Sequence, residues 1–277
     1  MKIIDGKSLA QNLRKTIANE VKQFSRPPGL AVVLVGDDEA SQVYVRNKTR
    51  ACVEVGFYSD QIHKSANITE EELLSEINRL NENQTIDGIL VQLPLPEHID
   101  SNKIIEAIIP EKDVDGFSSE NVGKLSLNKP FISPCTPKGV MKMLESIKCD
   151  LRGKDCVIIG ASNIVGRPMS MELLNAGATV QVCHKGTKNI TEKTKSADVI
   201  IAAAGVANLV KADWVKEGAV VIDVGINRLE DGTLAGDVDF EGVKDIASAI
   251  SPVPGGVGPM TIAVLLENTL IAYQAKL

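Results

Sequence analysis

Short apolar runs alternate with longer segments of mixed charge along most of the 277-residue chain, and this alternation limits the possible folds more than any other feature. Strands of a parallel sheet that helices cover on both sides are apolar on both faces. Six runs have this character, at residues 29–36, 87–96, 155–160, 178–184, 197–205 and 218–225. Two weaker strands are predicted at 57–62 and 247–251. The pattern predicts an α/β fold built from βαβ units.

Three helices between and after these strands have recognisable signals. Thr69 and Glu72 form a capping box before an apolar periodic segment. Thr136 and Pro137 suit a cap and the first helical position of another helix. The residues 258–277 are predicted to form one helix, because their apolar side chains recur at helical spacing.

Two domains are predicted from the length and from two breaks in the pattern. Residues 117–137 lose apolar periodicity, and residues 251–259 contain three prolines and three glycines. We therefore expect one domain formed by residues 1–120 and 259–277, and a second formed by residues 121–258. The first domain is then discontinuous, because the last helix returns to it.

Composition excludes several kinds of partner. The net charge of −6 argues against non-specific nucleic-acid binding, which needs clustered Lys and Arg, so a small-molecule partner is favoured. The first residues lack the apolar core of a signal peptide, and no apolar run reaches the roughly 18 residues of a membrane span. The expected location is the cytoplasm, without membrane association.

The five cysteines and three histidines predict neither disulfides nor a metal site. The cysteines are odd in number and lack metal-ligand spacing, so we interpret them as small buried hydrophobic residues. No two histidines stand at helical spacing. A single reactive cysteine is the competing interpretation.

A turn bounded by Gly160 and Gly166 follows the strand at 155–160 and leads into a helical segment. Such a turn leaves backbone N–H groups free at a helix N-terminus, where they bind the pyrophosphate of a dinucleotide. The spacing lacks the first pair of the G-x-G-x-x-G fingerprint. A tight strand–helix turn without a nucleotide explains the same residues, so both interpretations stay open on the motif alone.

Lys185 follows the second strand of this unit. NAD enzymes carry an acidic residue close to this position, where it binds the ribose 2′-hydroxyl, whereas a lysine suits a 2′-phosphate. If the turn binds a nucleotide, Lys185 favours NADP over NAD. Otherwise it is a solvated loop charge.

Tyr44 and Lys48 are four residues apart in a segment that we predict to be a helix ending at Gly56. A lysine stem on the apolar stripe of such a helix is desolvated, which disfavours its charged form and suits it to acid–base chemistry. A lysine whose ammonium reaches water along the surface is the alternative. Tyr-x-x-x-Lys also occurs in short-chain dehydrogenases, but there it follows the glycine turn, and here it precedes it. The stripe continues inward through Ala51, Cys52 and Val55.

Two further polar residues are ambiguous when taken singly. Gln92 lies near the carboxyl end of its predicted strand, where open α/β sheets place ligand contacts, although a glutamine there also pairs with backbone. Asp113 and Asp115 precede Gly116, which is typical of a simple turn as well as of a ligand-binding loop.

Seven segments together carry a specific resemblance. They are ASQVYVRNK (40–48), GILVQLPLP (88–96), PEKDVDGF (110–117), GASNIVGRPMS (160–170), VIDVGIN (221–227), GDVDF (236–240) and SPVPGGVGPMT (251–261). In this order they closely resemble the bifunctional methylenetetrahydrofolate dehydrogenase/methenyltetrahydrofolate cyclohydrolase family. VQLPLP and PVPGGVGPMT are far more specific than a generic turn motif, and the match covers nearly the whole chain.

The resemblance implies an enzyme with two activities on tetrahydrofolate derivatives. These are NADP-dependent oxidation of 5,10-methylenetetrahydrofolate to 5,10-methenyltetrahydrofolate, and hydrolysis of the latter to 10-formyltetrahydrofolate. It also implies an N-terminal α/β folate domain completed by the C-terminal helix, a Rossmann-like NADP-binding domain, a cleft between them, and a homodimer.

The resemblance further implies three sets of site residues. The catalytic set is Tyr44, Lys48, Gln92 and Asp115. The substrate-binding set adds Val91, Leu93, Pro254, Gly255, Gly256, Val257 and Gly258. The cofactor-binding set is Gly160, Ala161, Ser162, Ile164, Val165, Gly166, Lys185 and Ile226.

The chain departs from many family members at two cofactor positions. Ala161 stands where they have an arginine in a GRS sequence, and Lys185 stands where they have a small serine. We expect Lys185 to supply the cation that faces the 2′-phosphate.

The implied chemistry assigns different demands to the two steps. Hydride loss leaves a carbon between two nitrogens whose lone pairs delocalise the cation, so this step needs alignment and no proton acceptor. Attack of water on the methenyl cation needs proton transfer, for which Lys48, tuned by Tyr44 and Gln92, is suited. Asp115 is expected to accept N–H bonds from the pterin edge. A dehydrogenase without the hydrolytic step and a non-catalytic nucleotide sensor are the alternatives.

Overall fold

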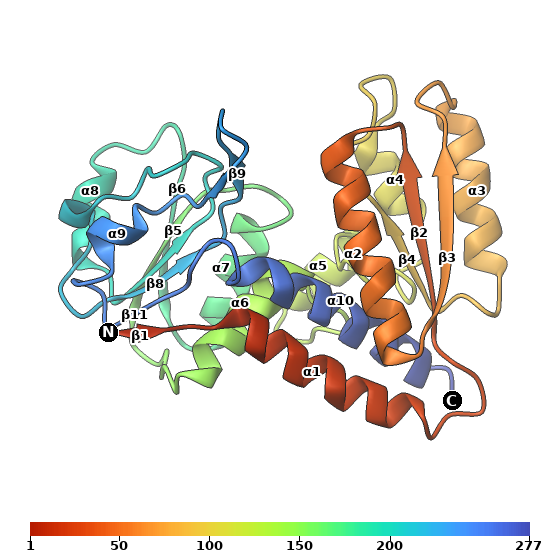
Figure 1. The fold of residues 1–277 in the computed structure, drawn as a ribbon, viewed down its shortest axis with the longest axis horizontal. Helices are drawn as coiled ribbons and strands as arrows, with labels where there is room; N and C mark the ends of the chain where they lie inside the picture. Colours follow the sequence, from red (N-terminus) through yellow and green to blue (C-terminus); the bar gives the residue numbers. More distant parts are fainter. The chain divides into compact units, whose positions relative to one another are not determined.

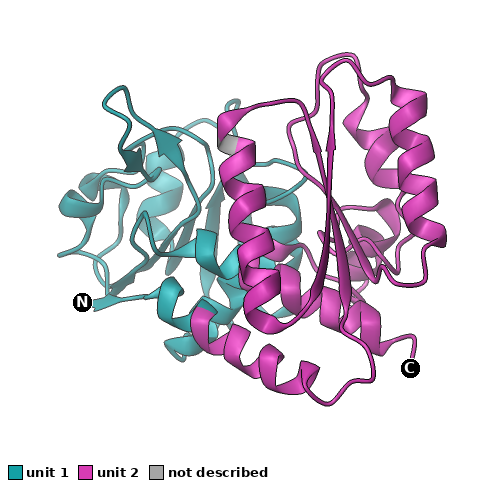
Figure 2. Ribbon diagram, turned by 45° about the vertical axis from the view of Figure 1, so that its right-hand side comes forward, with its two compact units in different colours: residues 1–10, 136–261 teal, residues 11–135, 262–277 magenta. Residues whose placement is uncertain are grey.

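The computed structural model describes residues 1–39 and 41–277 of the chain. They form two compact units (Figure 2). Residues 11–135 and 262–277, drawn in magenta as unit 2, are called the first unit below, and residues 1–10 and 136–261, drawn in teal as unit 1, are called the second unit. The predicted two-domain α/β class is confirmed, and so is the return of the C-terminal helix to the N-terminal part of the chain. The predicted domain boundaries at 120/121 and 258/259 stay a prediction.

The first of these units contains a parallel three-stranded sheet. Its strands are β2 (Gly29–Val35), β3 (Tyr58–Lys64) and β4 (Gly88–Val91), in the order β3-β2-β4. Side chains of a strand alternate between the two faces of a sheet. Leu30, Val32 and Leu34 accordingly belong to one core cluster, and Ala31, Val33 and Val35 to another.

Helices cover both faces of this sheet (Figure 1). The cluster of Leu30 is completed by α2 (Glu39–Val55) and by parts of α1 (Gly6–Val21) and α10 (Val257–Gln274). The cluster of Ala31 is completed by α3 (Glu70–Glu82) and α4 (Ser101–Ala107). The two-sided covering explains why β2 and β4 are apolar throughout, whereas the edge strand β3 carries polar residues.

The predicted helix signals are confirmed at α2 and α3 and wrong at α6 (Cys135–Ser146). At α3 the Thr69 hydroxyl accepts from the Glu72 N–H, and the Glu72 carboxylate accepts from the Thr69 N–H. Helix α2 ends at Gly56, whose φ is +80°. Helix α6 begins one residue before the predicted cap, so Thr136 lies in its first turn and its hydroxyl is 3.0 Å from that of Thr261.

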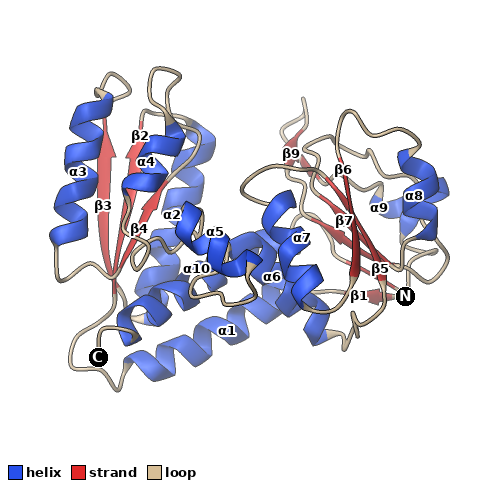
Figure 3. Cartoon of the chain, turned by 180° about the vertical axis from the view of Figure 1, so that it is seen from behind, coloured by secondary structure: helices blue, strands red, loops and turns tan.

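The second unit contains a parallel six-stranded sheet with the order β1-β11-β8-β7-β5-β6. Of these strands, Figure 3 labels β1, β5, β6 and β7. Four of its strands were predicted strongly and β11 weakly. The two residues of β1 were not predicted, because so short a strand carries no periodicity. The strands are β1 (Lys2–Ile3), β5 (Asp155–Ile159), β6 (Thr179–Cys183), β7 (Val199–Ala202), β8 (Val220–Asp223) and β11 (Ala249–Ile250).

Short helices and a hairpin complete the chain. Helix α5 (Ser119–Ser126) belongs to the first unit. The second unit has α7 (Gly166–Asn175), α8 (Ile190–Ser196), the 3₁₀ helix η1 (Ala212–Trp214), the hairpin of β9 (Asn227–Arg228) and β10 (Leu234–Ala235), and α9 (Phe240–Val243). No helix in the described part of the chain is both long and apolar enough to span a membrane.

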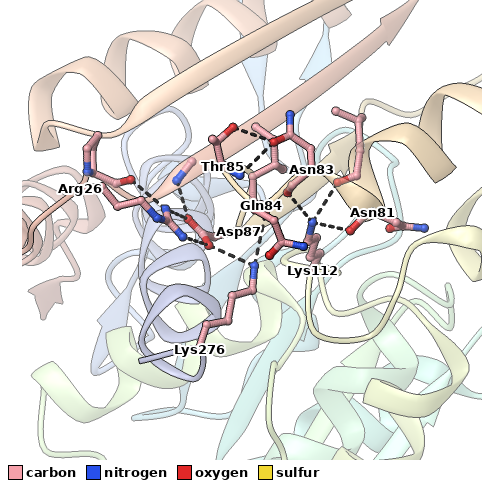
Figure 4. A network of polar contacts seen from close by, with 12 residues as sticks. Arg26, Asn81, Asn83, Gln84, Thr85, Asp87, Lys112 and Lys276 are labelled. Carbon is pink, nitrogen blue, oxygen red and sulfur yellow. Dashed lines mark hydrogen bonds and ion pairs between the residues drawn. The ribbon is translucent and has the colours of Figure 1, made fainter.

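A fully buried carboxylate, Asp87, joins three segments of the first unit (Figure 4). It accepts two hydrogen bonds from the Arg26 guanidinium, at 2.7 and 2.8 Å, one from the Gly29 N–H at 2.9 Å and one from Lys276 Nζ at 3.1 Å. Burial alone raises the pKa of a carboxyl, but these donors outweigh it and lower the pKa of Asp87. The network ties the C-terminal end of the chain to the start of β2.

Lys112, in the same view, closes the C-terminal end of α3. Its side chain is buried, and its three ammonium donors match three backbone carbonyls. Burial lowers the pKa of Lys112 to about 8. A cation at a helix C-terminus also complements the helix dipole. Through these contacts Lys112 anchors the loop that leads to Asp115 to the end of α3. Its acceptors are the carbonyl oxygens of Leu80, Asn81 and Asn83, at 2.9, 2.6 and 2.8 Å.

Candidate functional site

Lys48 and Gln92 meet at the carboxyl end of the three-stranded sheet. Helix α2 places the half-buried Lys48 above the inward stripe of Ala51, Cys52 and Val55, and its Nζ donates to Gln92 Oε1 at 2.9 Å. The Gln92 amide donates to the Leu93 carbonyl at 2.8 Å, which fixes its orientation. Burial lowers the pKa of Lys48, so its neutral amine is more accessible than that of a surface lysine.

Asp115 is the second ionisable group of this cluster. Burial raises its pKa to about 6, while the charge of Lys48 acts in the opposite direction and that of Asp113 adds to the rise. Asp115 in turn opposes the effect of burial on the pKa of Lys48. The carboxyl and the amine therefore each have a pKa displaced toward neutrality, a property typical of functional sites.

The loop that carries Asp115 is held by a second carboxylate, that of Asp113. Its two oxygens accept from the N–H groups of Gly116, Phe117 and Ser118, at 3.0, 3.2 and 2.8 Å, and from Asn121 Nδ2 at 2.9 Å. Gly116 has φ +75°, and a side chain there would lie 2.7 Å from the Pro134 backbone. Asp113 thus has the structural role that the sequence left open, and it fixes the position of Asp115.

Cys135 and Asn268 complete the cluster, and neither was predicted. The buried Cys135 thiol donates to the Val114 carbonyl at 3.2 Å and hydrogen-bonds to Asp115, which lowers the pKa of that carboxyl. Asn268 on α10 donates to the same Val114 carbonyl at 2.9 Å. We interpreted Cys135 as a small core residue, and no spacing in the sequence distinguishes it from the other cysteines.

The remaining substrate positions of this unit differ in exposure. Tyr44 lies one helical turn before Lys48, is 37 % exposed, and has a pKa that burial raises. Val91 is packed in the core and is only 5 % exposed. Leu93 is half-buried next to Gln92. Ala40, the first residue of the segment that carries the resemblance, lies outside the described residues.

A glycine-bounded turn, called the cradle below, follows β5 in the second unit. Gly160 has φ +131°, and a Cβ there would lie 2.0 Å from the Ala203 carbonyl. A Cβ on Gly166 would lie 2.1 Å from the Gly160 carbonyl. Helix α7 starts here without a side-chain cap at Val165. Its first N–H groups already have acceptors, because Gly166 donates to the Ser162 hydroxyl at 3.5 Å and Arg167 donates to the Ser162 carbonyl at 3.0 Å. The two glycines permit the close packing of strand, turn and helix that a dinucleotide-binding turn requires.

The other cofactor positions lie around this cradle. Ala161, Ser162 and Ile164 form the turn itself, where the Ser162 hydroxyl accepts from the Val165 N–H at 3.2 Å and Ile164 is 38 % exposed. Lys185 is exposed in the turn after β6. That turn is fixed because the His184 N–H donates to the Thr187 hydroxyl at 2.9 Å.

Ile226 lines a narrow cavity of ≈ 70 Å³ with the loop of residues 254–258. The Gly258 Cβ position lies 3.6 Å from the Ile226 side chain. The structure thereby brings one predicted cofactor residue together with predicted substrate residues. These are Pro254, Gly255, Gly256, Val257 and Gly258.

Metal ligands do not gather anywhere in the described part of the chain. Among residues 1–39 and 41–277, no group of three or more His, Cys, Asp or Glu side chains is arranged to hold a metal ion.

Two family models match the chain. Residues 4–115 match the catalytic domain of tetrahydrofolate dehydrogenase/cyclohydrolase, and residues 134–277 match its NAD(P)-binding domain. The bifunctional protein FolD of Ruthia magnifica is 63 % identical over 277 residues, which is 100 % of both chains.

Solved structures agree with this match. A crystal structure of the bifunctional enzyme FolD from Campylobacter jejuni is 54 % identical, covers 100 % of both chains and has a TM-score of 0.98. The Trypanosoma brucei methylenetetrahydrofolate dehydrogenase-cyclohydrolase, complexed with NADP cofactor and inhibitor, is 39 % identical with a TM-score of 0.95. It covers 99 % of this chain and 97 % of its own.

Proposed function

The chain belongs to the tetrahydrofolate dehydrogenase/cyclohydrolase family, and from that membership we propose which of its residues carry out the two reactions. It is a bifunctional enzyme that oxidises 5,10-methylenetetrahydrofolate with NADP and hydrolyses the resulting 5,10-methenyltetrahydrofolate to 10-formyltetrahydrofolate. The predicted oxidoreductase and hydrolase activities are confirmed, which leaves no room for the dehydrogenase-only and sensor alternatives. The assignment of residues below rests mainly on the hydrogen bond between Lys48 and Gln92.

Lys48 is the acid–base group of the hydrolytic step. A water molecule bonds to the methenyl carbon and passes a proton to the Lys48 amine, whose lowered pKa makes the neutral form accessible. The bond from this carbon to N5 then breaks as Lys48 returns the proton to N5. The remaining hydroxyl proton is released to solvent, so that the C=O of the formyl group forms on N10. Gln92 Oε1 holds the amine in place. Tyr44, one helical turn away on α2, is assigned to the same step.

The oxidative step needs a nucleotide site and no proton acceptor. NADP supplies the hydride acceptor when it is bound. We assign its pyrophosphate to the cradle at Gly160 and Gly166, where only glycine permits the close packing of the turn against the Ala203 and Gly160 carbonyls. The proposed cofactor-binding set also contains Ala161, Ser162, Ile164, Val165 and Ile226.

Two sets of predicted residues are assigned to the folate. Asp115 accepts hydrogen bonds from the donor edge of the pterin, and Val91 and Leu93 contribute backbone contacts beside Gln92. The residues 254–258 contact the folate, which is supported by their position on the cavity beside Ile226.

The affinity for folate is expected to fall as the pH falls through about 6. The pKa of Asp115 is raised to about 6, and below that pH the protonated carboxyl loses its capacity to accept two N–H bonds. The KM for methylenetetrahydrofolate, measured from pH 5 to 8, should therefore rise at the acid end. Asp115→Asn should give a high KM without this inflection, and a wild-type KM that stays constant across the range would contradict the role.

Lys185 is expected to set the preference for NADP. It stands after β6, where a cation can face the ribose 2′-phosphate, and Ala161 lacks the charge that many relatives have. Lys185→Ala should lower kcat/KM for NADP by about 10- to 150-fold, since a charge-assisted bond contributes roughly 1.5–3 kcal/mol, and should leave kcat/KM for NAD unchanged. Lys188→Ala, on the same turn, is the control. An unchanged NADP/NAD ratio in Lys185→Ala would remove Lys185 from this role.

A homodimer in the cytoplasm is also proposed. An uncovered edge of the six-stranded sheet supports the dimer, because Val182 on the edge strand β6 is 37 % exposed and Leu174 on α7 is 54 % exposed. The free cysteines, four of them buried, are consistent with a reducing compartment. Sedimentation velocity at micromolar concentration tests the dimer, and a single monomeric species would contradict it.

Absorbance at two wavelengths tests the function. The purified protein is given methylenetetrahydrofolate and NADP, and then methenyltetrahydrofolate alone. We expect nicotinamide reduction in the first experiment and loss of the methenyl chromophore without nucleotide in the second. Absence of either signal in folded protein would contradict the bifunctional assignment.

A further inference from the structure

Two buried carboxylates in the second unit are not used by the chemistry described so far. Asp223 ends β8 and is 3 % exposed, and Asp237 follows β10 and is 0 % exposed. Ionised side chains are rarely buried unless donors surround them. In both cases the donors are mainly backbone N–H groups of loops, so each carboxylate holds loops together.

Asp237 joins two loops at the carboxyl edge of the six-stranded sheet. Its Oδ2 accepts from the N–H groups of Ala204 and Gly205, at 2.5 and 2.9 Å, and its Oδ1 accepts from the Val206 N–H at 2.9 Å. Oδ1 also accepts from Asn227 Nδ2 at 2.9 Å. The loop after β7 and the loop after β8 therefore share one carboxylate.

Asp223 holds Asp237 in position. Its Oδ1 accepts from the N–H groups of Gly225 and Asp237, both at 2.9 Å, and its Oδ2 accepts from the Val238 N–H at 2.9 Å. Each carboxylate also occupies the space that a side chain on a neighbouring glycine would fill. A Cβ on Gly225 would lie 2.2 Å from Asp237 Oδ1, and a Cβ on Gly236 would lie 1.9 Å from Asp223 Oδ2.

The loops tied by Asp237 lie on one particular side of the cradle. In the strand order β8-β7-β5-β6, the cradle follows β5, and Lys185 follows β6 on one side of it. A dinucleotide bound along the carboxyl edge of this sheet lies across several strands. If its adenosine lies at β6, its nicotinamide end lies over β7 and β8. The loop after β7 touches the cradle, because a Cβ on Gly160 would meet the Ala203 carbonyl at 2.0 Å.

We propose that Asp237, fixed by Asp223, is the positioning residue for the nicotinamide end of the cofactor, through the loops of residues 204–206 and 225–227. This inference rests on the proposed placement of NADP in the second unit. We therefore expect loss of Asp237 to weaken binding of the nicotinamide half of NADP and not of the adenosine half. Among the hydrogen bonds described above, none joins Asp237 to the cradle or to Lys185.

Asp237→Asn tests the proposal through binding. The asparagine keeps the shape of the side chain but turns an NH₂ group toward two of the four donors. The dissociation constant of NADP, measured by calorimetry, should rise by about 10- to 100-fold, as expected when a supporting residue is removed from a positioned site. The dissociation constant of 2′,5′-ADP, which lacks the nicotinamide half, should stay within a factor of about two, and so should the cyclohydrolase rate.

Asp239→Asn is the matched control, because Asp239 lies two residues away and accepts from the Gly242 N–H at the start of α9. It should leave NADP affinity unchanged. Asn227→Ala removes one donor of Asp237 and serves if Asp237→Asn does not fold; it should raise the dissociation constant of NADP several-fold.

Three outcomes would contradict either the role of Asp237 or the NADP site on which it rests. Unchanged NADP affinity in Asp237→Asn would overturn the positioning role. Equal losses for NADP and 2′,5′-ADP would overturn its assignment to the nicotinamide end. Failure of the wild-type protein to bind either molecule would instead refute the proposed cofactor site.

Discussion

Replacement of Lys48 by alanine is expected to lower the cyclohydrolase kcat by about 10²- to 10⁴-fold, the usual contribution of a positioned acid–base group. Much of the dehydrogenase activity should survive, because hydride loss from methylenetetrahydrofolate leaves a cation that its own nitrogens stabilise. In the presence of NADP the variant should therefore release methenyltetrahydrofolate into solution. Stopped-flow absorbance, which records nicotinamide reduction and the methenyl chromophore together, measures both effects in one experiment.

Arg50→Ala is the control for this experiment, because Arg50 is an exposed cation on the same helix α2. The dehydrogenase and cyclohydrolase activities of Arg50→Ala should match those of the wild type. Loss of the two activities in equal measure in Lys48→Ala, with a normal melting temperature, would contradict the separation of roles. Lys48→Arg should not restore hydrolysis, since a guanidinium stays protonated throughout this pH range.

Replacement of Asp87 by alanine is expected to lower the free energy of unfolding by about 3 kcal/mol, near the lower limit for breaking a buried ion pair. The side chain of Asp87 is fully buried, but Arg26 and Lys276 are partly exposed and regain some hydration when their partner is removed. Urea denaturation at pH 7, followed by circular dichroism, measures the change. Glu54→Ala, which breaks the exposed ion pair with Arg14, should cost no more than about 1 kcal/mol.

The loss of stability in Asp87→Ala should become smaller as the pH falls. The pKa of Asp87 is lower in the folded protein than in the unfolded chain, so its stabilisation is present above the unfolded pKa of about 4. It is lost as the pH falls through the lower folded pKa. The difference between wild type and Asp87→Ala should therefore shrink in acid, and a difference that grows would contradict the assignment.

The sequence predicts best those features that depend on neighbouring residues. The strand of residues 29–36 was predicted from its apolar side chains, and helix α3 from the capping pair of Thr69 and Glu72, because both signals lie within one element. Strand β1 and the first residue of α6 were not predicted. Two paired residues have no periodicity, and Cys135 has no local feature that distinguishes a helix start.

The candidate site shows the same limit. Lys48 and Asp115 were found through a resemblance that covers most of the chain, since each was ambiguous on its own. Cys135, Asn268 and Asp237 were missed because their partners are distant in sequence. Asn268 donates to Val114, 154 residues earlier, and Asp237 accepts from Ala204, 33 residues earlier. Only the folded backbone brings such pairs within hydrogen-bond distance.

A crystal structure of the enzyme with NADP and a non-reactive folate analogue tests the central claim most directly. The account predicts that the nicotinamide ring and Lys48 Nζ both reach the one-carbon position of the folate, with the nicotinamide about 3.5 Å from that carbon. It also predicts that Lys48 keeps its hydrogen bond to Gln92. A complex in which Lys48 Nζ is more than about 8 Å from that carbon, with no water linking them, would contradict the account.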